Sequence, residues 1–318
     1  MKKKIAVFSV IVLVILGLSV LILIYQSTHF RSRTRTLTFE NTQRSYIIHT
    51  PPNYNGVSKV PLVIALHGYQ QHPKFFELDS GLSRLADQNN FIVVYPFGTE
   101  DNKGNNRSWN AGACCDPAAK DQVNDIGFIK ELIAQIQKDE AIKGSKIYVI
   151  GFSNGGILAH KIAAQLDDTV AAVAVVGGSI GGTPVGDSTY TIADSSSPVP
   201  IVMIHGRDDT TVSYTGDLSE KLPITFKSFQ ESSTFWALVD GCSLSSSLIE
   251  KNTLYIHSEF PLCLYNSAVE TYTVLNSGHE WFGGLFARIF HPFSDHFDAT
   301  YRIWLFLSQY PKQSIEEK

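Results

Sequence analysis

The segment Gly151-Phe-Ser-Asn-Gly-Gly156 places a serine between closely spaced glycines. A short apolar run at residues 146–150 precedes it and a helical pattern begins at Asn154, so the segment is expected to join a strand to a helix. In that context G-x-S-x-G indicates a strained turn that projects the serine hydroxyl above a sheet, with glycines leaving room for neighbouring backbone. We therefore predict that Ser153 is a nucleophile; the alternative is an ordinary glycine-rich turn.

A serine becomes a nucleophile only when a base removes its proton and an acid supports that base. In folds with this turn, the acid and then the histidine follow the serine along the chain. The predicted strand at residues 201–205 ends just before Asp208 and Asp209, and either could be the acid. Residues 270–275 alternate like a strand and lead into a glycine loop with His279, which we predict to be the base.

The oxyanion of an acyl-transfer intermediate needs two preorganised N–H donors. One is expected from Asn154, the residue after the nucleophile, because the start of a helix directs free N–H groups at negative charge. The other is expected from Tyr69, in the loop that follows the predicted strand at residues 60–66. His67 lies in the same loop but precedes the serine in the chain, so we predict a structural role for it.

The elements that must position these residues alternate along the chain. Short, continuous, β-branched runs are typical of strands covered on both faces, and they occupy residues 60–66, 91–95, 146–150, 170–176 and 201–205. Helical patterns start near Asp125 and cover residues 154–166 and 297–307. This alternation predicts an α/β fold with a mostly parallel central sheet and helices on both faces. Residues 177–198 are expected to form a long loop, and whether it acts as a lid stays open.

Length and composition are typical of one large globular domain. The chain has 318 residues, of which 44% are hydrophobic and 18% charged, and its net charge is −4. This composition excludes a disordered or collagen-like chain. The slight acidity argues against nucleic acid as a partner, because phosphate binding needs a clustered positive surface. The cysteines, histidines and acidic residues lack the spacing of metal ligands, so neither a metal nor a cofactor is expected.

The amino-terminal segment differs from the rest of the chain. Three lysines precede an apolar run at residues 5–25, which as a helix would be about 31 Å long and could cross a bilayer. Because the run lacks a small-x-small cleavage site, an uncleaved signal anchor with one transmembrane helix is predicted over residues 1–27; a cleaved signal peptide and a buried helix are the alternatives. Residues 28–36 are expected to be a polar tether, and residues 37–318 the catalytic domain.

Four cysteines allow three disulfide pairings, and the sequence alone does not choose among them. Cys242 and Cys263 are candidates for a loop-closing bridge, whereas Cys114 and Cys115 are adjacent and would form a strained bond. Four buried free thiols are the alternative. Structural disulfides persist outside the cytosol. They would therefore accord with a membrane-anchored protein whose catalytic domain is extracytoplasmic, or with a secreted one if the amino-terminal segment is cleaved.

Seven blocks follow one another along the chain: Pro61-Leu-Val-Ile-Ala-Leu-His-Gly68, Val94-Tyr-Pro96, Ser108-Trp-Asn-Ala-Gly-Ala-Cys-Cys115, Asn124-Asp-Ile-Gly-Phe128, Gly151-Phe-Ser-Asn-Gly-Gly156, His205-Gly-Arg-Asp-Asp209 and Gly278-His-Glu-Trp281. With these blocks, residues 44–311 resemble the polyhydroxybutyrate depolymerase-type esterases, which include feruloyl esterase-like members, within the α/β-hydrolase superfamily. The resemblance implies an α/β-hydrolase fold and a secreted serine esterase that acts on hydroxyacid polymers, oligomers or aromatic acid esters.

The resemblance also implies roles for single residues. The acid is the fifth residue of the His-Gly-x-x-Asp block, which is the second of the two aspartates, Asp209. The family's His-x-Trp-Pro-Gly reads His279-Glu-Trp-Phe-Gly283 here, with Phe282 in place of the proline. Trp109 and Trp281 could then flank the acyl group as aromatic walls that bind substrate, with plain core packing as the alternative.

Together these residues predict a serine esterase that works through an acyl-serine intermediate, with Ser153, Asp209 and His279 as its triad. The alternatives are a serine peptidase or thioesterase on the same fold, or a catalytically dead, membrane-anchored binding module. The expected partners are the membrane, through the amino-terminal helix, and a small or oligomeric ester. Bulk polymer is not expected, because no separate surface-binding domain fits after the terminal helix. The sequence does not predict an oligomeric state.

Overall fold

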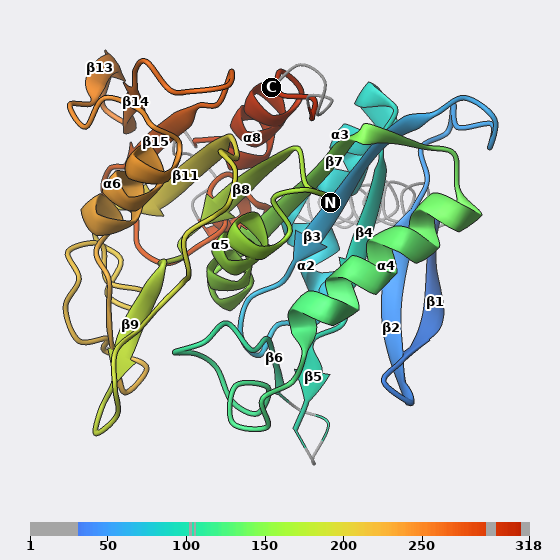
Figure 1. Cartoon of the computed structure of the whole chain (residues 1–318), viewed down its shortest axis with the longest axis horizontal. Coiled ribbons are helices and arrows are strands. Elements are labelled where there is room, and N and C mark those ends of the chain that lie inside the picture. The colour runs from blue at the N-terminus through green and yellow to red at the C-terminus, as the bar shows by residue number, and fades with distance from the viewer. Residues whose placement is uncertain (1–30, 102–103, 105, 291–296, 313–318) are drawn as a thin grey trace, which may run out of the picture.

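A ten-stranded sheet forms the centre of the molecule (Figure 1). The computed structural model describes residues 31–101, 104, 106–290 and 297–312. The central strands pair in parallel and are, in spatial order, β4 (Ile92–Pro96), β3 (Val60–Leu66), β7 (Ile142–Phe152), β8 (Ala172–Val176), β11 (Ile201–Gly206) and β15 (Val269–Val274). Antiparallel strands extend both sides: β2 (Thr42–His49) and β1 (Ser32–Phe39) beyond β4, and β14 (Tyr255–Phe260) and β13 (Ser247–Lys251) beyond β15.

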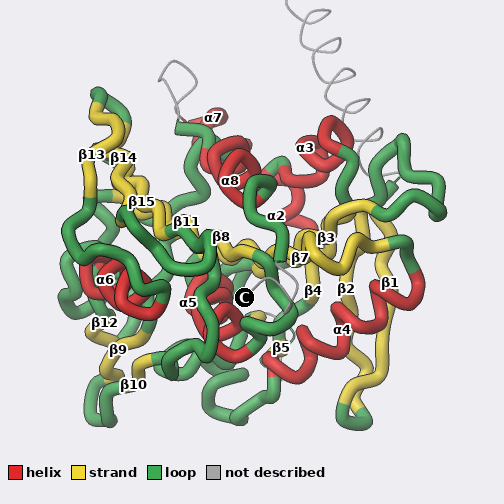
Figure 2. The backbone as a smooth tube through the Cα atoms, turned by 45° about the horizontal axis from the view of Figure 1, so that its top comes forward, coloured by secondary structure: helices red, strands yellow, loops and turns green. Residues whose placement is uncertain are grey.

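Helices cover both faces of the sheet (Figure 2). One face carries α2 (Pro73–Ser80), α3 (Leu82–Asn89), α7 (Leu285–Phe290) and α8 (Ala299–Leu307). The other carries α4 (Asp125–Asp139), α5 (Asn154–Gln165) and α6 (Phe229–Val239). Short strands lie outside this framework: β5 (Thr99–Glu100), β6 (Arg107–Ser108), β9 (Gly181–Pro184), β10 (Tyr190–Thr191) and β12 (Ile224–Phe226).

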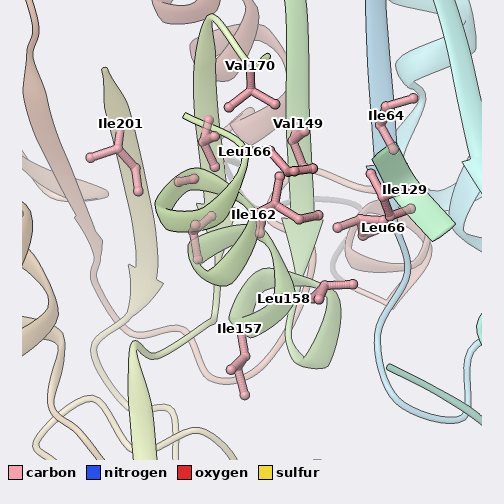
Figure 3. Close-up of a cluster of buried hydrophobic side chains, with 14 of the residues drawn as sticks. Ile64, Leu66, Ile129, Val149, Ile157, Leu158, Ile162, Leu166, Val170 and Ile201 are labelled. Carbon is pink, nitrogen blue, oxygen red and sulfur yellow. The ribbon is translucent and has the colours of Figure 1, made fainter. Parts of the chain in front are cut away.

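The central strands are buried on both faces, which explains their continuous apolar sequences. Every residue of β4, β8 and β11 is buried. Figure 3 shows part of the core on one face, where Ile162 of α5 lies near Val149 of β7 and Leu158 lies one turn earlier on the same helix. All three of these side chains are fully buried. Truncating such a residue to alanine typically costs about 2–5 kcal/mol, so this packing holds α5 on the sheet.

The predicted α/β architecture is confirmed. The five apolar runs form β3, β4, β7, β8 and β11, and the three helical patterns form α4, α5 and α8. The sheet is mostly parallel, with helices on both faces. The side chain of Asn124 accepts a hydrogen bond from the N–H of Gly127 and so caps the start of α4.

The prediction of a tether over residues 28–36 is wrong from Ser32 onwards, because β1 begins there. β1 pairs with β2 along its whole length, from Ser32 opposite His49 to Phe39 opposite Thr42. Its polar and basic residues resemble a linker in the sequence because an edge strand keeps much of its surface in solvent. The folded domain therefore starts before residue 37.

The prediction of a long irregular loop at residues 177–198 is wrong in part. β9 and β10 form a hairpin in this segment, and β12 pairs with the other side of β9. The two strands β9 and β10 approach closely, since a Cβ on Gly181 would collide with the carbonyl of Tyr190. Short strands of Gly, Thr and Tyr lack the apolar runs by which the central strands are recognised.

The predicted signal anchor at residues 1–27 lies outside the described residues. Within the described part of the chain, no helix combines the length and the apolar character needed to cross a membrane.

Both candidate cysteine pairs are disulfide-bonded. Cys242 and Cys263 join the end of α6 to the loop after β14, with a bond of 2.03 Å. Cys114 and Cys115 are bonded to each other in the segment that follows β6. The alternative of four free thiols is therefore wrong.

Candidate active site

Ser153 lies at the turn between β7 and α5, where the sequence predicts it. Its backbone has φ +55° and ψ −120°, a conformation that residues other than glycine rarely adopt. The turn is tight, because a Cβ on Gly151 would collide with the carbonyl of Gly155, and one on Gly155 with the carbonyl of Leu66. The Ser153 N–H donates to the carbonyl of Val176 at 2.8 Å, which ties the turn to the end of β8. These contacts hold the hydroxyl at the carboxyl edge of the sheet.

His279 connects Ser153 to Asp209. It lies in the loop after β15, with its Nε2 atom 2.8 Å from Ser153 Oγ and its Nδ1 atom 2.7 Å from Asp209 Oδ2. An ionised carboxylate only accepts hydrogen bonds, so Nδ1 carries the proton and Nε2 is left to accept from the serine hydroxyl. The imidazole stacks on Phe152 with 5.2 Å between ring centroids. A hydroxyl, an imidazole and a carboxylate thus form one chain of hydrogen bonds.

The carboxylate of Asp209 is buried, with 3% of the residue exposed. Its Oδ1 atom accepts from two backbone N–H groups of its own loop, at 2.8 and 3.0 Å. Burial raises the pKa of Asp209, but hydrogen bonds from His205 and His279 outweigh it and hold the pKa well below its usual range. Asp209 is therefore ionised at neutral pH and can stabilise a positive charge on His279.

Tyr69 lies in the loop after β3, next to the nucleophile. A Cβ on Gly68 would be 3.3 Å from Ser153 Cβ, so the two backbone segments approach closely. The Gln70 N–H donates to a carbonyl of β6 at 2.8 Å, which holds the loop in place. Within the described residues, no acceptor is recorded for the N–H of Tyr69 or of Asn154. This arrangement suits the predicted oxyanion donors, whose role remains a prediction.

The side chain of Asn154 has a structural role that the sequence did not reveal. Its Oδ1 atom accepts from the Trp109 N–H at 2.7 Å, and its Nδ2 atom donates to the Trp109 carbonyl at 3.1 Å. The amide therefore pairs with the Trp109 backbone as a neighbouring strand would. This pairing fixes the first residue of α5, whose N–H is the predicted oxyanion donor.

His67 has the structural role that the sequence predicts. It is fully buried, its Nδ1 atom lies 2.7 Å from the Gly68 carbonyl, and its Nε2 atom accepts from the Gly98 N–H at 3.0 Å. Burial lowers the pKa of His67 to about 3, so the imidazole is neutral at physiological pH. Its two nitrogens are both used within the protein, which leaves neither for a substrate proton.

The interpretation of Trp109 and Trp281 as aromatic walls is wrong. Their exposed fractions are 0% and 2%, so neither ring faces an open pocket. Trp109 Nε1 donates to the His67 carbonyl, and Trp281 Nε1 donates to the Thr300 hydroxyl, each at 2.9 Å. Both tryptophans are core residues, and their side chains pack against the loops that carry the catalytic groups. Phe282, the residue in the proline position, is also buried.

A buried ion pair supports the segment that carries Trp109. Asp125 is 1% exposed and bonds to Arg44 at 2.9 Å, and it accepts from the Asn110 N–H at 2.8 Å. The Arg44 guanidinium also lies 3.9 Å from the centroid of the Phe128 ring. These contacts join β2, α4 and the Trp109 segment. Arg44 carries no motif of its own, so sequence reasoning could not have found this contact.

The described residues offer no evident metal or cofactor site. In this part of the chain, no group of three His, Cys, Asp or Glu side chains is placed to hold a metal ion. A cavity of about 580 Å³ lies between the β1–β2 turn, β5 and the start of α4. Its lining includes Phe39, Phe97 and Glu100 but no residue of the hydrogen-bond chain, so the catalytic groups lie outside it.

Comparisons with known proteins identify the family. A family model described as Esterase PHB depolymerase matches residues 44–216. Feruloyl esterase B of Piromyces equi is 28% identical over 208 residues, which are 63% of this chain and 36% of the relative. Poly(3-hydroxyalkanoate) depolymerase C of Paucimonas lemoignei is 26% identical over 246 residues, which are 70% of this chain and 55% of the relative. The chain thus spans about a third to a half of the length of these relatives.

A solved structure shares the fold. The acetyl xylan esterase from Aspergillus awamori superposes with a TM-score of 0.56 at 17% identity, over 78% of this chain and 94% of that one.

Proposed function

The chain belongs to the PHB depolymerase family of esterases, and on that premise we propose that it is a serine esterase that hydrolyses carboxylic esters. The observation that carries the proposal is the hydrogen-bond chain from Ser153 through His279 to Asp209. A serine hydroxyl attacks an ester only when such a base and acid accompany it. Because all three hydrogen-bonded groups are present, the site argues against a catalytically dead binding module.

The reaction proceeds in two halves. Ser153 Oγ attacks the ester carbonyl while His279 Nε2 takes its proton, and Asp209 stabilises the resulting imidazolium. The tetrahedral intermediate then expels the alcohol, which receives the proton from His279, and an acyl-serine remains. In the second half, His279 takes a proton from water, the hydroxide attacks the acyl-serine, and the proton returns to Ser153 as the acid leaves.

The N–H groups of Tyr69 and Asn154 hold the oxyanion in both tetrahedral intermediates. The support for this assignment is the close approach of the Tyr69 loop to Ser153 and the position of Asn154 at the start of α5. A single donor of this kind is typically worth about 10²–10³ in kcat. The pairing of the Asn154 side chain with Trp109 preorganises one of the two donors.

The proposed substrates are esters of hydroxyalkanoate oligomers and aromatic or short-chain acyl esters. The support is the similarity to a feruloyl esterase and a poly(3-hydroxyalkanoate) depolymerase. Peptide and thioester hydrolysis use the same catalytic groups, so a direct comparison of leaving groups is needed.

The proposed location is the extracytoplasmic side of a membrane, with residues 1–27 as a signal anchor, or outside the cell if that segment is cleaved. The two disulfides support an oxidising compartment, since structural disulfides persist outside the cytosol. Cell fractionation, with protease added to intact cells, tests the location. Full protection of the catalytic domain from the protease would contradict it.

The function is tested by measuring turnover of wild type and Ser153→Ala on one panel. The panel contains nitrophenyl acetate, methyl ferulate, hydroxybutyrate dimers and trimers, a nitroanilide and a thioester. Wild type is expected to hydrolyse esters, and Ser153→Ala to lose at least about 10³-fold in kcat with an unchanged melting temperature.

Ser188→Ala is the matched control, because Ser188 is exposed and its hydroxyl bonds to the neighbouring Asp187 rather than to a triad residue. It is expected to hydrolyse esters at the wild-type rate. The proposal fails if Ser153→Ala hydrolyses the esters as fast as wild type, or if wild type turns over only the amide or the thioester.

A further inference from the structure

His205 lies at the end of β11, four residues before Asp209, and only 1% of it is exposed. Its Nε2 atom is 2.8 Å from the carbonyl of Val212 and 3.2 Å from Asp209 Oδ2. Both neighbours are acceptors, so Nε2 must carry a proton that it shares between them. His205 is thus a second imidazole in contact with the catalytic acid.

The hydrogen bonds of Asp209 show which oxygen this second imidazole serves. Oδ1 accepts from the N–H groups of Thr211 and Val212. Oδ2 accepts from His279 at 2.7 Å, and His205 is its second donor. His205 therefore contacts the same oxygen that orients the catalytic base.

Aromatic rings hold His205 in this orientation. Tyr214 and Phe229 meet the imidazole at steep angles, with centroids 5.8 and 5.3 Å away. The Tyr214 hydroxyl bonds to Thr273 of β15 at 2.9 Å, which fixes that ring in turn. The contacts come from α6 and from the loop after Asp209, and together they enclose the imidazole.

The other titratable groups around the two imidazoles are few. His160, on α5, accepts from Trp236 Nε1 at 2.9 Å, and burial followed by the effect of His205 lowers the pKa of His160 to about 3. The Arg207 guanidinium lies 5.7 Å from the Tyr214 ring. Beside His279, Glu280 is the next residue on the same loop, and it interacts with Asp79. Apart from His279, only His205 among these groups contacts Asp209.

We propose that His205 is a positioning residue of the triad, which holds Asp209 Oδ2 in line with His279 and shares its negative charge. The inference rests on the proposed esterase function. It predicts two effects when the imidazole is removed. The carboxylate loses a donor, so His279 is less well oriented and kcat falls. Asp209 then offers its full charge to His279, so the acid limb of the pH–rate profile moves to higher pH.

The test compares His205→Phe, His205→Gln and His205→Asn in the full-length protein, with nitrophenyl acetate as the substrate. A glutamine amide reaches approximately the position of Nε2, whereas an asparagine amide reaches only that of Nδ1. His205→Phe and His205→Asn are expected to lower kcat by about 10–100-fold, the range for one hydrogen bond to a charged group, with KM within about twofold of wild type. His205→Gln is expected to recover most of kcat.

The pH profile separates positioning from a merely structural effect. The acid limb of kcat/KM reports the pKa of the base in the free enzyme. It is expected to shift upward by about half a unit or more in His205→Phe and His205→Asn, and to stay at the wild-type pH in His205→Gln. Melting temperatures and active-site titration with a fluorophosphonate establish how much of each variant is folded.

His160→Asn is the matched control, because His160 is equally buried and bonds to Trp236 rather than to Asp209. It is expected to leave the acid limb unchanged. The inference is overturned if His205→Asn keeps the wild-type kcat and acid limb, or if His205→Gln is as impaired as His205→Asn. If His205→Phe does not fold, the two amide variants still decide the question. Absence of ester turnover in wild type would instead overturn the proposed function.

Discussion

At the scale of single residues, adjacent aspartates have opposite environments. Asp208 is exposed, whereas Asp209 is buried and bonded to His279. Asp209→Asn is expected to lower kcat by about 10⁴-fold, because an amide at Oδ2 stabilises the wrong tautomer of the histidine. Asp208→Asn is expected to change kcat less than twofold. Steady-state kinetics of both variants check this, and equal loss in the two would reassign the acid.

A second prediction concerns Asp240, which lies at the end of α6. Burial raises the pKa of Asp240 to about 7, although it accepts hydrogen bonds from Ser267 and Val199. Between about pH 4 and 7 the folded state holds a proton that the unfolded state has released, so stability falls as the pH rises through this window. Asp240→Asn keeps the hydrogen bond from Val199 through its amide oxygen, its amide nitrogen donates to the Ser267 hydroxyl, and it has no such proton. It is therefore expected to be more stable than wild type at pH 8, by on the order of 2–4 kcal/mol.

Urea unfolding at pH 4 and pH 8 checks the prediction for Asp240. The two proteins should have similar free energies of unfolding at pH 4 and differ at pH 8. Asp121→Asn, at an exposed position, serves as the control and should behave as wild type at both values. A stability difference that is the same at both pH values would contradict the assigned titration.

Sequence reasoning found the catalytic residues that can be recognised by their position after a predicted strand. Ser153 and His279 follow recognisable strands, and the structure joins them at hydrogen-bond distance. The tryptophans were misplaced because an aromatic side chain in a catalytic loop has the same sequence signature whether it faces substrate or core. His205 could have been found, since it opens the block that ends at Asp209.

At the scale of elements, the contact between α5 and β3 requires a glycine at position 155. A Cβ on Gly155 would collide with the carbonyls of Leu66 and His67, which precede the proposed oxyanion loop. Gly155→Ala is therefore expected to destabilise the fold by more than about 2 kcal/mol and to reduce turnover, as overpacking forces the helix away. Thermal unfolding and ester kinetics measure the two effects.

Gly144→Ala is the control for Gly155→Ala. Gly144 lies on β7, and an added Cβ would meet only the Gln137 side chain, at an ordinary 3.6 Å. It should leave activity at the wild-type level and cost little stability. Equal damage in the two variants would show that the loss does not come from the contact with β3.

The sequence predicted the buried elements better than the exposed ones. Continuous apolar runs identify central strands, because burial on both faces leaves no place for polar residues. The amphipathic helices α2 and α3 are only eight residues each, too short for a clear period. α6 carries a detectable signal, a capping box between Ser228 and Glu231, which could have located its start.

At the scale of the whole molecule, the folded domain includes β1. The strand pairs with β2 in eight positions, Ser32 bonds to His49 and Glu77, and Arg35 bonds to Glu140. A fragment of residues 31–318 is therefore expected to fold and to retain turnover. A fragment of residues 41–318 lacks these contacts and is expected to melt at a lower temperature or to aggregate.

Thermal unfolding and nitrophenyl acetate hydrolysis of the two fragments check this boundary. Equal melting temperatures would show that β1 contributes nothing to the fold. If residues 1–27 act as the proposed anchor, the full chain will sediment with membranes and the fragment from residue 31 will not.

The ten-stranded sheet also has consequences for how copies of the molecule meet. Within the described residues, β1 and β13 form its two ends, and each has one neighbouring strand. An open strand edge is a template for pairing with another chain. Arg33 places an exposed positive charge on β1, so two such edges repel each other. At the other end, Leu248 and Ile249 of β13 are exposed, and a register shift follows Leu248. Edge-to-edge aggregation should therefore begin at β13, restrained there by an irregular backbone instead of by charge.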